Sequence, residues 1–505
     1  MNVALDRSKL MSSALPPTQP VPLRTGAAFL AGLNDGRAIY VDGQKVENIA
    51  THPAFKGAAL AAANLFDIAA DPANRERMTY TSPTSGGPVL RAYQIPKSHE
   101  DLRAKRLASE MWSESTFGLL GRTPDHVSGF FAGFAAVPGV FAEGGDEYAR
   151  NVLAFYEHAR ETHAWITYAI VPPQTDRSKP ANLQSDPALY AGVVGEKAGG
   201  IIVSGAQQLA SAGVFSDYVY ISCIKPLKAG EENQAIGVII PVNTPGLKLY
   251  PRRPFAAHAS NTFDYPLTSR FDESDCFVVL EDCFVPWEHV FIYKNTEVCR
   301  KQWWDTPSHL YGNLQAQARY ATKLRFLMGL AQRMNELTGN AGNPAVQVQM
   351  GELAAHVMTV ESMLEAQEVR AKFDENGVLW PCRATLYAVM ALQSEMNPKM
   401  IEIVRELSGA ALISMPSSLA DLESPVTGPD IERYMGSSQA GARERIAFMR
   451  LAWDFIGSEF ANRHHQYEKF YGGANFIVKT NMYKNYDFAR SLAMVEKAMN
   501  LPDIP

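Results

Sequence analysis

The segment that decides the fold reads Tyr168-Ala169-Ile170-Val171-Pro172-Pro173-Gln174-Thr175-Asp176-Arg177-Ser178. Its apolar start is typical of a β-strand, and the two prolines that follow exclude a helix because proline lacks an N–H donor. The polar groups after them can hydrogen-bond a flat, polar ligand. The segment therefore predicts a ligand-gripping loop at the end of a strand, although the same pattern is also common in surface turns.

The chain changes character on either side of this segment. Before it, apolar residues recur at helical spacing within residues 51–72, 98–118 and 143–166. After it, short β-rich runs alternate with turn residues up to about residue 295, which predicts an antiparallel sheet. The helical period then returns in long segments and predicts an antiparallel bundle: 314–337, 346–373, 384–407 and 440–460.

These changes give the expected domain organisation of the chain. The order is helices, sheet and bundle, so we predict an α+β fold. The expected parts are a flexible tail (1–23), a mainly helical domain (24–167), a β domain that carries the ligand loop (168–295), a helical bundle (296–475) and a C-terminal tail (476–505).

Composition narrows the class of protein. A chain of 505 residues with 46% hydrophobic and 20% charged residues is typical of a globular protein with two or three packed units. The net charge of −6 and the absence of a basic run argue against nucleic acid as a partner. Five scattered cysteines without a C-x-x-C pair indicate reduced thiols and no metal site. No apolar run is long enough to span a membrane, so we expect a cytoplasmic protein.

The chain contains neither a G-x-G-x-x-G motif after a strand nor a G-x-x-x-x-G-K-[ST] motif. These two patterns mark dinucleotide-binding and phosphate-binding loops. If the protein carries out redox chemistry, we therefore expect its electrons to arrive from outside.

Several short motifs together resemble one family of enzymes over roughly residues 24 to 475. The motifs are Arg24-Thr25-Gly26, Asn34-Asp35-Gly36-Arg37, Thr51-His52-Pro53, Gly121-Arg122-Thr123-Pro124-Asp125, Val171-Pro172-Pro173, Thr268-Ser269-Arg270-Phe271-Asp272-Glu273, Val285-Pro286-Trp287-Glu288 and Gly457-Ser458-Glu459-Phe460. Their order is similar to that in the oxygenase component of 4-hydroxyphenylacetate 3-monooxygenase and in the related two-component phenol, halophenol and nitrophenol monooxygenases.

The resemblance implies an acyl-CoA dehydrogenase-like fold with a C-terminal four-helix bundle, usually assembled as a homotetramer. It implies that a separate NAD(P)H:flavin reductase supplies FADH2. O2 then forms a flavin C4a-hydroperoxide that hydroxylates a phenolic substrate, which is 4-hydroxyphenylacetate-like, phenol, a halophenol or a nitrophenol. The protein must exclude water and hold the substrate ring.

The resemblance also assigns residues to the flavin. The family's flavin loop corresponds here to Tyr168, Ala169, Ile170, Gln174, Thr175, Asp176 and Arg177. Ser211 resembles a flavin-contacting Thr, and Ser458 belongs to the motif that leads to Arg463. Arg463 resembles a flavin-contacting arginine, whose fork of donors suits a pyrophosphate or an electron-rich ring.

On the substrate side, the resemblance implies that Arg122, His126 and Tyr168 surround the phenol hydroxyl. The 4-hydroxyphenylacetate branch has Tyr where this chain has His126, and His where it has Tyr168, so the pair is exchanged. Both side chains can donate or accept a hydrogen bond. We expect Arg122 to favour the ionised phenol. A purely structural role for His126 stays open.

Two further histidines are candidates. His289 occupies a position where the halophenol and nitrophenol branch has a histidine proposed as the base that deprotonates the phenol, a task suited to imidazole. His465 falls near a substrate-stacking Phe of that branch, so we predict that it lines the substrate pocket. Either histidine can instead be a packing residue.

Three other functions compete with this interpretation. An acyl-CoA dehydrogenase-like flavoprotein would keep FAD tightly bound and use a bundle carboxylate such as Glu361 as its base. A 4-hydroxybutyryl-CoA dehydratase would need cysteine ligands for an iron–sulfur cluster, yet residues 100 to 165 contain no cysteine. A non-catalytic helical assembly protein would bind no flavin.

Overall fold

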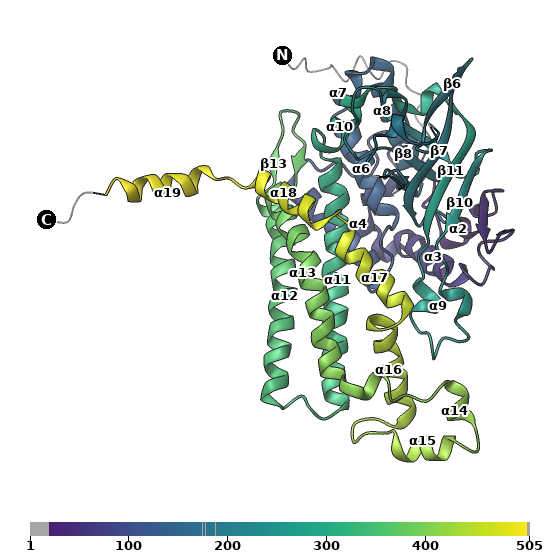
Figure 1. Cartoon of the computed structure of the whole chain (residues 1–505), viewed down its shortest axis with the longest axis vertical. Helices are drawn as coiled ribbons and strands as arrows, with labels where there is room; N and C mark the ends of the chain where they lie inside the picture. The colour runs from purple at the N-terminus through teal and green to yellow at the C-terminus, as the bar shows by residue number, and fades with distance from the viewer. Residues whose placement is uncertain (1–19, 174, 177, 187, 502–505) are drawn as a thin grey trace.

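A computed structural model describes residues 20–173, 175–176, 178–186 and 188–501. A body of helices and two sheets lies beside a bundle of long helices, and one C-terminal helix projects from the molecule (Figure 1). Most of the tail predicted over residues 1–23 lies outside the described residues, as do Gln174 and Arg177 of the predicted flavin loop.

Helices dominate the first part of the chain, as predicted. Their bounds are α2 (Gly26–Gly32), α3 (Lys56–Ala70), α4 (Arg75–Met78), α5 (His99–Ser115), α6 (Pro124–Ala136), α7 (Gly139–Ala142) and α8 (Asp146–Glu161). Thr25 caps α2, because its hydroxyl oxygen accepts the N–H of Ala28 at 3.2 Å. A small hairpin of β3 (Thr79–Thr81) and β4 (Pro88–Leu90) lies between α4 and α5.

The strands form two main sheets. The six-stranded sheet has the order β2 (Gln44–Lys45), β1 (Ala38–Val41), β10 (Leu247–Pro251), β11 (Asp275–Pro286), β7 (Gly200–Ser211) and β6 (Gly192–Lys197). The four-stranded sheet has the order β12 (Val290–Ile292), β9 (Gly237–Pro241), β8 (Tyr218–Ser222) and β5 (Ile166–Ala169).

Two strand pairs differ from the predicted antiparallel pattern. Strand β1 pairs with β10 in parallel, and β5 pairs with β8 in parallel. Long connections separate the partners of both pairs in sequence, and parallel pairing needs such crossovers, whereas hairpins join antiparallel neighbours. The early β1–β2 hairpin therefore belongs to the large sheet rather than to the helices around it.

The C-terminal bundle is built on three long helices. They are α11 (Ser308–Leu337), α12 (Pro344–Val369) and α13 (Arg383–Ser408), and α10 (Thr296–Trp304) leads into them. The fourth position of the predicted four-helix bundle is shared by two shorter helices, α16 (Ala442–Ile456) and α17 (Glu459–Phe470). The remaining elements are α9 (Thr268–Phe271), β13 (Lys372–Phe373), β14 (Leu379–Trp380), α14 (Leu419–Glu423), α15 (Gly428–Tyr434), α18 (Asn475–Asn485) and α19 (Ala489–Met499).

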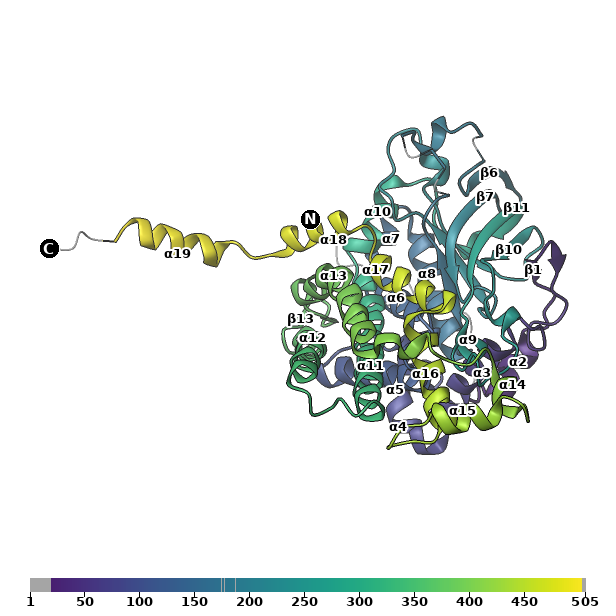
Figure 2. The same cartoon turned by 60° about the horizontal axis from the view of Figure 1, so that its bottom comes forward.

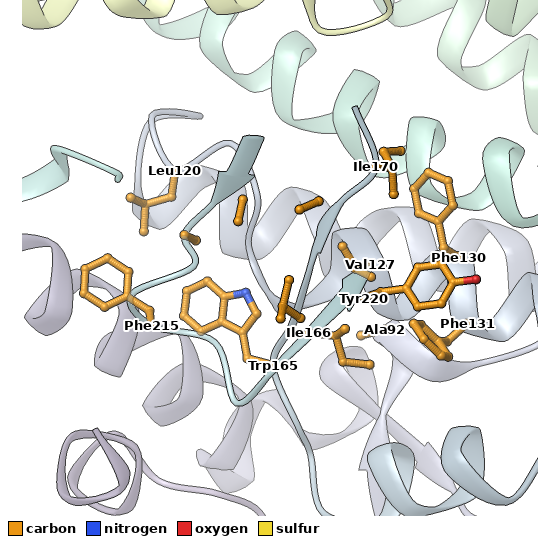
Figure 3. Packing of buried hydrophobic residues seen from close by; sticks show 14 of the residues in the cluster. Ala92, Leu120, Val127, Phe130, Phe131, Trp165, Ile166, Ile170, Phe215 and Tyr220 are labelled. Carbon is orange, nitrogen blue, oxygen red and sulfur yellow. The ribbon is translucent and has the colours of Figure 1, made fainter. Parts of the chain in front are cut away.

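Close packing of α6 against α11 joins the first part of the chain to the bundle. Every residue of α6 is buried. A Cβ placed on Gly133 would come within 2.2 Å of the Ser308 backbone nitrogen, so the two helices approach as only glycine permits. Strand β5 also packs against α6, and at its start Trp165 and Ile166 lie among apolar side chains (Figure 3).

The architecture confirms the predicted acyl-CoA dehydrogenase-like order of helical domain, sheets and bundle. Within the described residues, no helix combines the length and the apolar character that a membrane span requires.

Candidate active site

Arg122, His126 and Tyr168 lie side by side where α6 meets β5. The Tyr168 hydroxyl oxygen lies 3.3 Å from His126 Nε2, and Arg122 Nη1 lies 3.4 Å from His126 Nδ1. The Arg122 guanidinium carbon lies 5.9 Å from the centre of the Tyr168 ring. The structure thus brings together the three residues predicted to face the substrate hydroxyl, which we call the Arg122 cluster.

Local structure fixes the position of this cluster. Pro124 occupies the first turn of α6, where no N–H is needed for a helical hydrogen bond, and His126 lies buried in the same turn. Phe130, one turn further along α6, lies 5.4 Å from the His126 ring and 5.4 Å from the Tyr168 ring, measured between ring centres. His126 and Tyr168 are therefore both packed against the apolar ring of Phe130.

Gln315 of α11 connects the cluster to the bundle, and the motifs gave no sign of it. Its Oε1 lies 3.1 Å from His126 Nδ1, and its Nε2 donates to Thr123 Oγ1 at 2.9 Å. Thr123 in turn donates to Asp125 Oδ1 at 2.5 Å. Four buried residues from the start of α6 and from α11 therefore form one continuous hydrogen-bonded chain.

Arg122 is a buried cation without a carboxylate partner among the described residues. Its side chain makes no ion pair with a carboxylate in the described part of the chain, although the residue is only 8% exposed. Burial lowers the pKa of Arg122, but Tyr168 and Tyr467 raise it by more, so the side chain stays charged. Burial lowers the pKa of His126 well below its ordinary value, and Arg122 lowers it further, so His126 is neutral.

Glu273 and Tyr467 also belong to this region and were not predicted as site residues. The Glu273 carboxylate accepts the backbone N–H groups of Gly121 at 3.0 Å and Arg122 at 2.8 Å. The Tyr467 ring of α17 lies 5.2 Å from the Arg122 guanidinium carbon. Burial raises the pKa of Tyr467 to about 12 against the lowering effect of Arg122 and Arg319, so its hydroxyl stays protonated.

The predicted flavin loop begins where β5 ends. Val171 exchanges two backbone hydrogen bonds with Gln208 of β7, at 2.9 and 2.8 Å, and this bridge anchors the loop after Ala169 and Ile170. The Thr175 hydroxyl lies 3.5 Å from Gln184 Oε1. Asp176 Oδ1 accepts the Ser178 N–H at 3.0 Å. These contacts order the described residues of the loop on the surface of the β domain.

Ser211 and Arg463, two predicted flavin contacts, meet at Asp275. The Ser211 hydroxyl donates to Asp275 Oδ1 at 2.6 Å, and Arg463 Nε donates to Asp275 Oδ2 at 2.8 Å. Arg463 also contacts Glu273 at 3.1 Å. The third predicted contact, Ser458, caps α17 by accepting the Ala461 N–H at 3.0 Å.

The donors in this region fit a flavin. Arg463 Nη1 is buried and has no hydrogen-bond partner among the described residues, so the fork retains a donor for an electron-rich group. Asp275 fixes the rest of the guanidinium. Arg463 is therefore held in place, and its Nη1 amino group has no hydrogen-bond partner among the described residues.

Among the described residues, the other two candidate histidines make no hydrogen bond or ring contact with the Arg122 cluster. His289 sits in the turn Trp287–His289, where its ring centre lies 6.4 Å from that of Phe155. Burial lowers the pKa of His289. His465 Nε2 donates to the Ile456 carbonyl at 3.3 Å, and burial lowers the pKa of this histidine to about 4. The proposed roles of both histidines stay predictions.

The competing functions require a base such as Glu361 or a set of cysteine ligands, and the structure shows the surroundings of both. Glu361 accepts a hydrogen bond from Arg325 Nε at 2.7 Å and is partly exposed, so its charge is neutralised at the edge of the bundle. All five cysteines are free, and the described residues contain no cluster of three or more side chains suited to a metal ion.

The fold is that of a class of flavin-dependent enzymes, and in this chain a buried arginine, a histidine and a tyrosine lie in contact within it. The N-terminal family model of 4-hydroxyphenylacetate 3-hydroxylase matches residues 25–292, and the C-terminal model matches residues 299–500. The chain belongs to this family, whose members are oxygenase components of FADH2-dependent aromatic monooxygenases.

Individual relatives resemble the chain over nearly its whole length. The 4-hydroxyphenylacetate 3-monooxygenase oxygenase component of Pseudomonas aeruginosa is 35% identical, covering 90% of this chain and 88% of the relative. The oxygenase component of 4-nitrophenol 2-monooxygenase from a Rhodococcus species is 32% identical, with 90% and 87% covered. A crystal structure of the 4-hydroxyphenylacetate 3-monooxygenase oxygenase component with FAD and 4-hydroxyphenylacetate has a TM-score of 0.88 at 32% identity, covering 94% of this chain and 99% of that one.

Proposed function

We propose that the protein uses FADH2 and O2 to hydroxylate a phenol that binds at Arg122, His126 and Tyr168. One observation carries the assignment of the substrate: Arg122 is a buried cation with no carboxylate partner in the described part of the chain. Burying an unpaired charge is costly, and a phenol oxygen that carries negative charge would offset the cost. Relatives that hydroxylate phenols support the same substrate class.

The flavin belongs beside this cluster, between the loop after β5 and helix α17. Bound there, it supplies the activated oxygen atom. Arg463 would donate to it through its Nη1 amino group, which has no partner among the described residues, while Asp275, itself hydrogen-bonded by Ser211, keeps the guanidinium in place. The apolar wall around Phe130 would exclude water from the substrate ring.

A separate NAD(P)H:flavin reductase is the expected electron source. The sequence lacks both dinucleotide-binding patterns, and the relatives are described as oxygenase components. A cytoplasmic location is part of the same proposal, because all five cysteines are free thiols.

Assembly into a homotetramer completes the proposal. Helix α19 projects from the molecule and has no buried residue (Figure 2). Four of its apolar side chains are more than half exposed: Leu492, Met494, Val495 and Met499. A helix of this length is marginal alone in water and gains stability by packing against another surface, which a second copy of the chain would provide.

Replacing Arg122 by Ala tests the substrate assignment. We expect FADH2-dependent hydroxylation of a panel of phenols to fall roughly 100-fold, because the charge that stabilises the phenolate is lost. FADH2 binding should change much less, since the predicted flavin contacts do not include Arg122. Arg300→Ala, which removes an exposed arginine paired with Glu297, is the matched control.

Unchanged hydroxylation by Arg122→Ala would contradict the assignment. The flavoprotein alternative makes a different prediction: the purified protein would be yellow, with tightly bound FAD that an acyl-CoA reduces. A protein that is colourless as purified, and that hydroxylates phenols only when FADH2 is supplied, would support the proposal.

A further inference from the structure

In the hydrogen-bonded chain that runs from Asp125 through Thr123 and Gln315 to His126, the donor and the acceptor of each hydrogen bond can be assigned. Thr123 Oγ1 donates its hydrogen to the Asp125 carboxyl oxygen Oδ1 at 2.5 Å. The same oxygen accepts from Gln315 Nε2 at 2.9 Å. The Gln315 amide is thereby oriented with its Oε1 facing His126 Nδ1 at 3.1 Å.

This orientation fixes the tautomer of His126. An amide oxygen cannot donate, so His126 Nδ1 carries the hydrogen and donates it to Gln315. In a neutral imidazole the other nitrogen is then an acceptor, so the Tyr168 hydroxyl donates to His126 Nε2 across 3.3 Å. The Tyr168 oxygen keeps its lone pairs for a further donor. Arg122 can only donate, so its 3.4 Å approach to the protonated Nδ1 is not a hydrogen bond, and Nδ1 donates instead to the closer Gln315 oxygen at 3.1 Å. The Arg122 Nη1 group is therefore available for a ligand.

We propose that His126 is the base that takes the phenol proton, that it acts through Tyr168, and that Gln315 is the positioning residue that makes this possible. The inference rests on the function proposed above. The phenol proton passes to the Tyr168 oxygen as the Tyr168 proton passes to His126 Nε2. The products are a phenolate beside Arg122 and an imidazolium that donates one N–H to Tyr168 and the other to Gln315. No electrons move in this step.

The surroundings of His126 explain why the proton moves only with substrate present. Burial, Arg122 and Arg319 disfavour the imidazolium, whereas Gln315 and the carbonyl of Gly312 favour it. A phenolate adds a negative charge beside this group and offsets the two arginines. His289 offers no such arrangement, because its Nδ1 is buried without a hydrogen-bond partner in the described residues.

Gln315→Leu removes the acceptor from His126 Nδ1 and keeps the side chain's bulk. With phenol as substrate at mildly alkaline pH, we expect hydroxylation to fall by about 10- to 100-fold. With 4-nitrophenol, which is already ionised at that pH, we expect a loss of less than about threefold, because no base is needed. Gln315→Glu keeps an oxygen that accepts from Nδ1 and should restore most of the rate with phenol.

A pH profile with phenol alone gives a second readout. In the Gln315→Leu variant the rate should climb as the pH approaches the ionisation of free phenol, since the pre-ionised substrate bypasses the base. The wild-type protein should reach its plateau at lower pH. A purely structural role for Gln315 would lower the rate by the same factor at every pH.

Gln317→Leu is the matched control. Gln317 is buried on the same helix, but its Nε2 donates to the Leu386 carbonyl at 2.9 Å and it does not contact His126. This variant should leave the ratio of the phenol and nitrophenol rates unchanged. Equal losses for both substrates in Gln315→Leu, or a pH profile like that of the wild type, would overturn the inference. A wild-type protein that hydroxylates no phenol with FADH2 would refute the proposed function instead.

Discussion

Three buried arginines lie over the Tyr467 ring and differ in their carboxylate partners. Arg319 donates two hydrogen bonds of 2.7 Å to Glu468, and Arg463 is paired with Asp275. Arg122 has no carboxylate of its own among the described residues. A buried charge needs a partner of opposite charge. Of the three arginines, Arg122 is therefore the one for which we expect a bound ligand to supply that charge.

Glu468 joins α17 to α11, and its charge depends on pH. Burial raises the pKa of Glu468, but Arg319 and Lys323 lower it by more, to about 2, from an ordinary 4.5. A lowered pKa in the folded state stabilises the protein above the ordinary value. The contribution of Glu468 to the free energy of unfolding should therefore be complete above about pH 4.5 and should disappear as the pH falls towards 2.

Glu468→Gln should lower the free energy of unfolding at neutral pH by about 3–5 kcal/mol, because Arg319 and Lys323 stay buried without their carboxylate. Below about pH 3 the variant and the wild type should differ much less. Urea denaturation at both pH values measures this. Glu395→Gln breaks an exposed pair with Lys479 and should change stability by less than about 1 kcal/mol. Equal effects of the two variants would refute the argument.

Sequence reasoning found part of the site and missed the rest for a physical reason. Arg122, His126 and Tyr168 could be predicted because each belongs to a short sequence motif whose neighbouring residues are also recognisable. Gln315 lies 189 residues from His126 in an ordinary helical pattern, and only the packing of α11 on α6 brings the two together. No local pattern signals that a particular buried amide will face a histidine.

At the scale of elements, α6 shows that a helix buried on all sides cannot be predicted from the periodicity of its apolar residues. Apolar and small residues occupy nearly the whole segment, so no apolar face alternates with a polar one, and periodicity did not predict a helix there. The long bundle helices were predicted from helical spacing sustained over long segments, and α12 and α13 keep exposed residues along their length, although the first half of α11 is buried on all sides. The parallel pairs β1–β10 and β5–β8 were likewise not foreseen, since strand pairing over such separations leaves no local signal.

The close approach of α6 and α11 makes Gly133 a sensitive position. Gly133→Ala should lower the free energy of unfolding by roughly 1–3 kcal/mol, because the new Cβ would meet the Ser308 backbone, which cannot rotate away. Thermal or urea denaturation measures the change. Gly351→Ala in α12 has nothing within 4 Å of the new Cβ and should leave stability unchanged or raise it by up to about 1 kcal/mol. A stable Gly133→Ala variant would show that the helices can separate without cost.

At the scale of the whole molecule, the projecting α19 should control assembly. A chain lacking residues 487–505 should form a smaller species than the full-length protein in light scattering coupled to size-exclusion chromatography. The truncation leaves the buried Val478 contact of α18 in place, so each subunit should keep its fold. An unchanged mass after truncation, or a monomeric full-length chain, would contradict the tetramer proposed here.

The parallel pairing of β1 with β10 sets an order of events during synthesis. The partner of Ala38, Lys248, is synthesised only after helices α2 to α8 and strands β2 to β9. The first domain-sized stretch of the nascent chain is therefore left with an unsatisfied strand edge for many seconds of translation. Closure of the large sheet waits for the middle of the chain, so the amino-terminal helices cannot reach their final state as an independent folding unit.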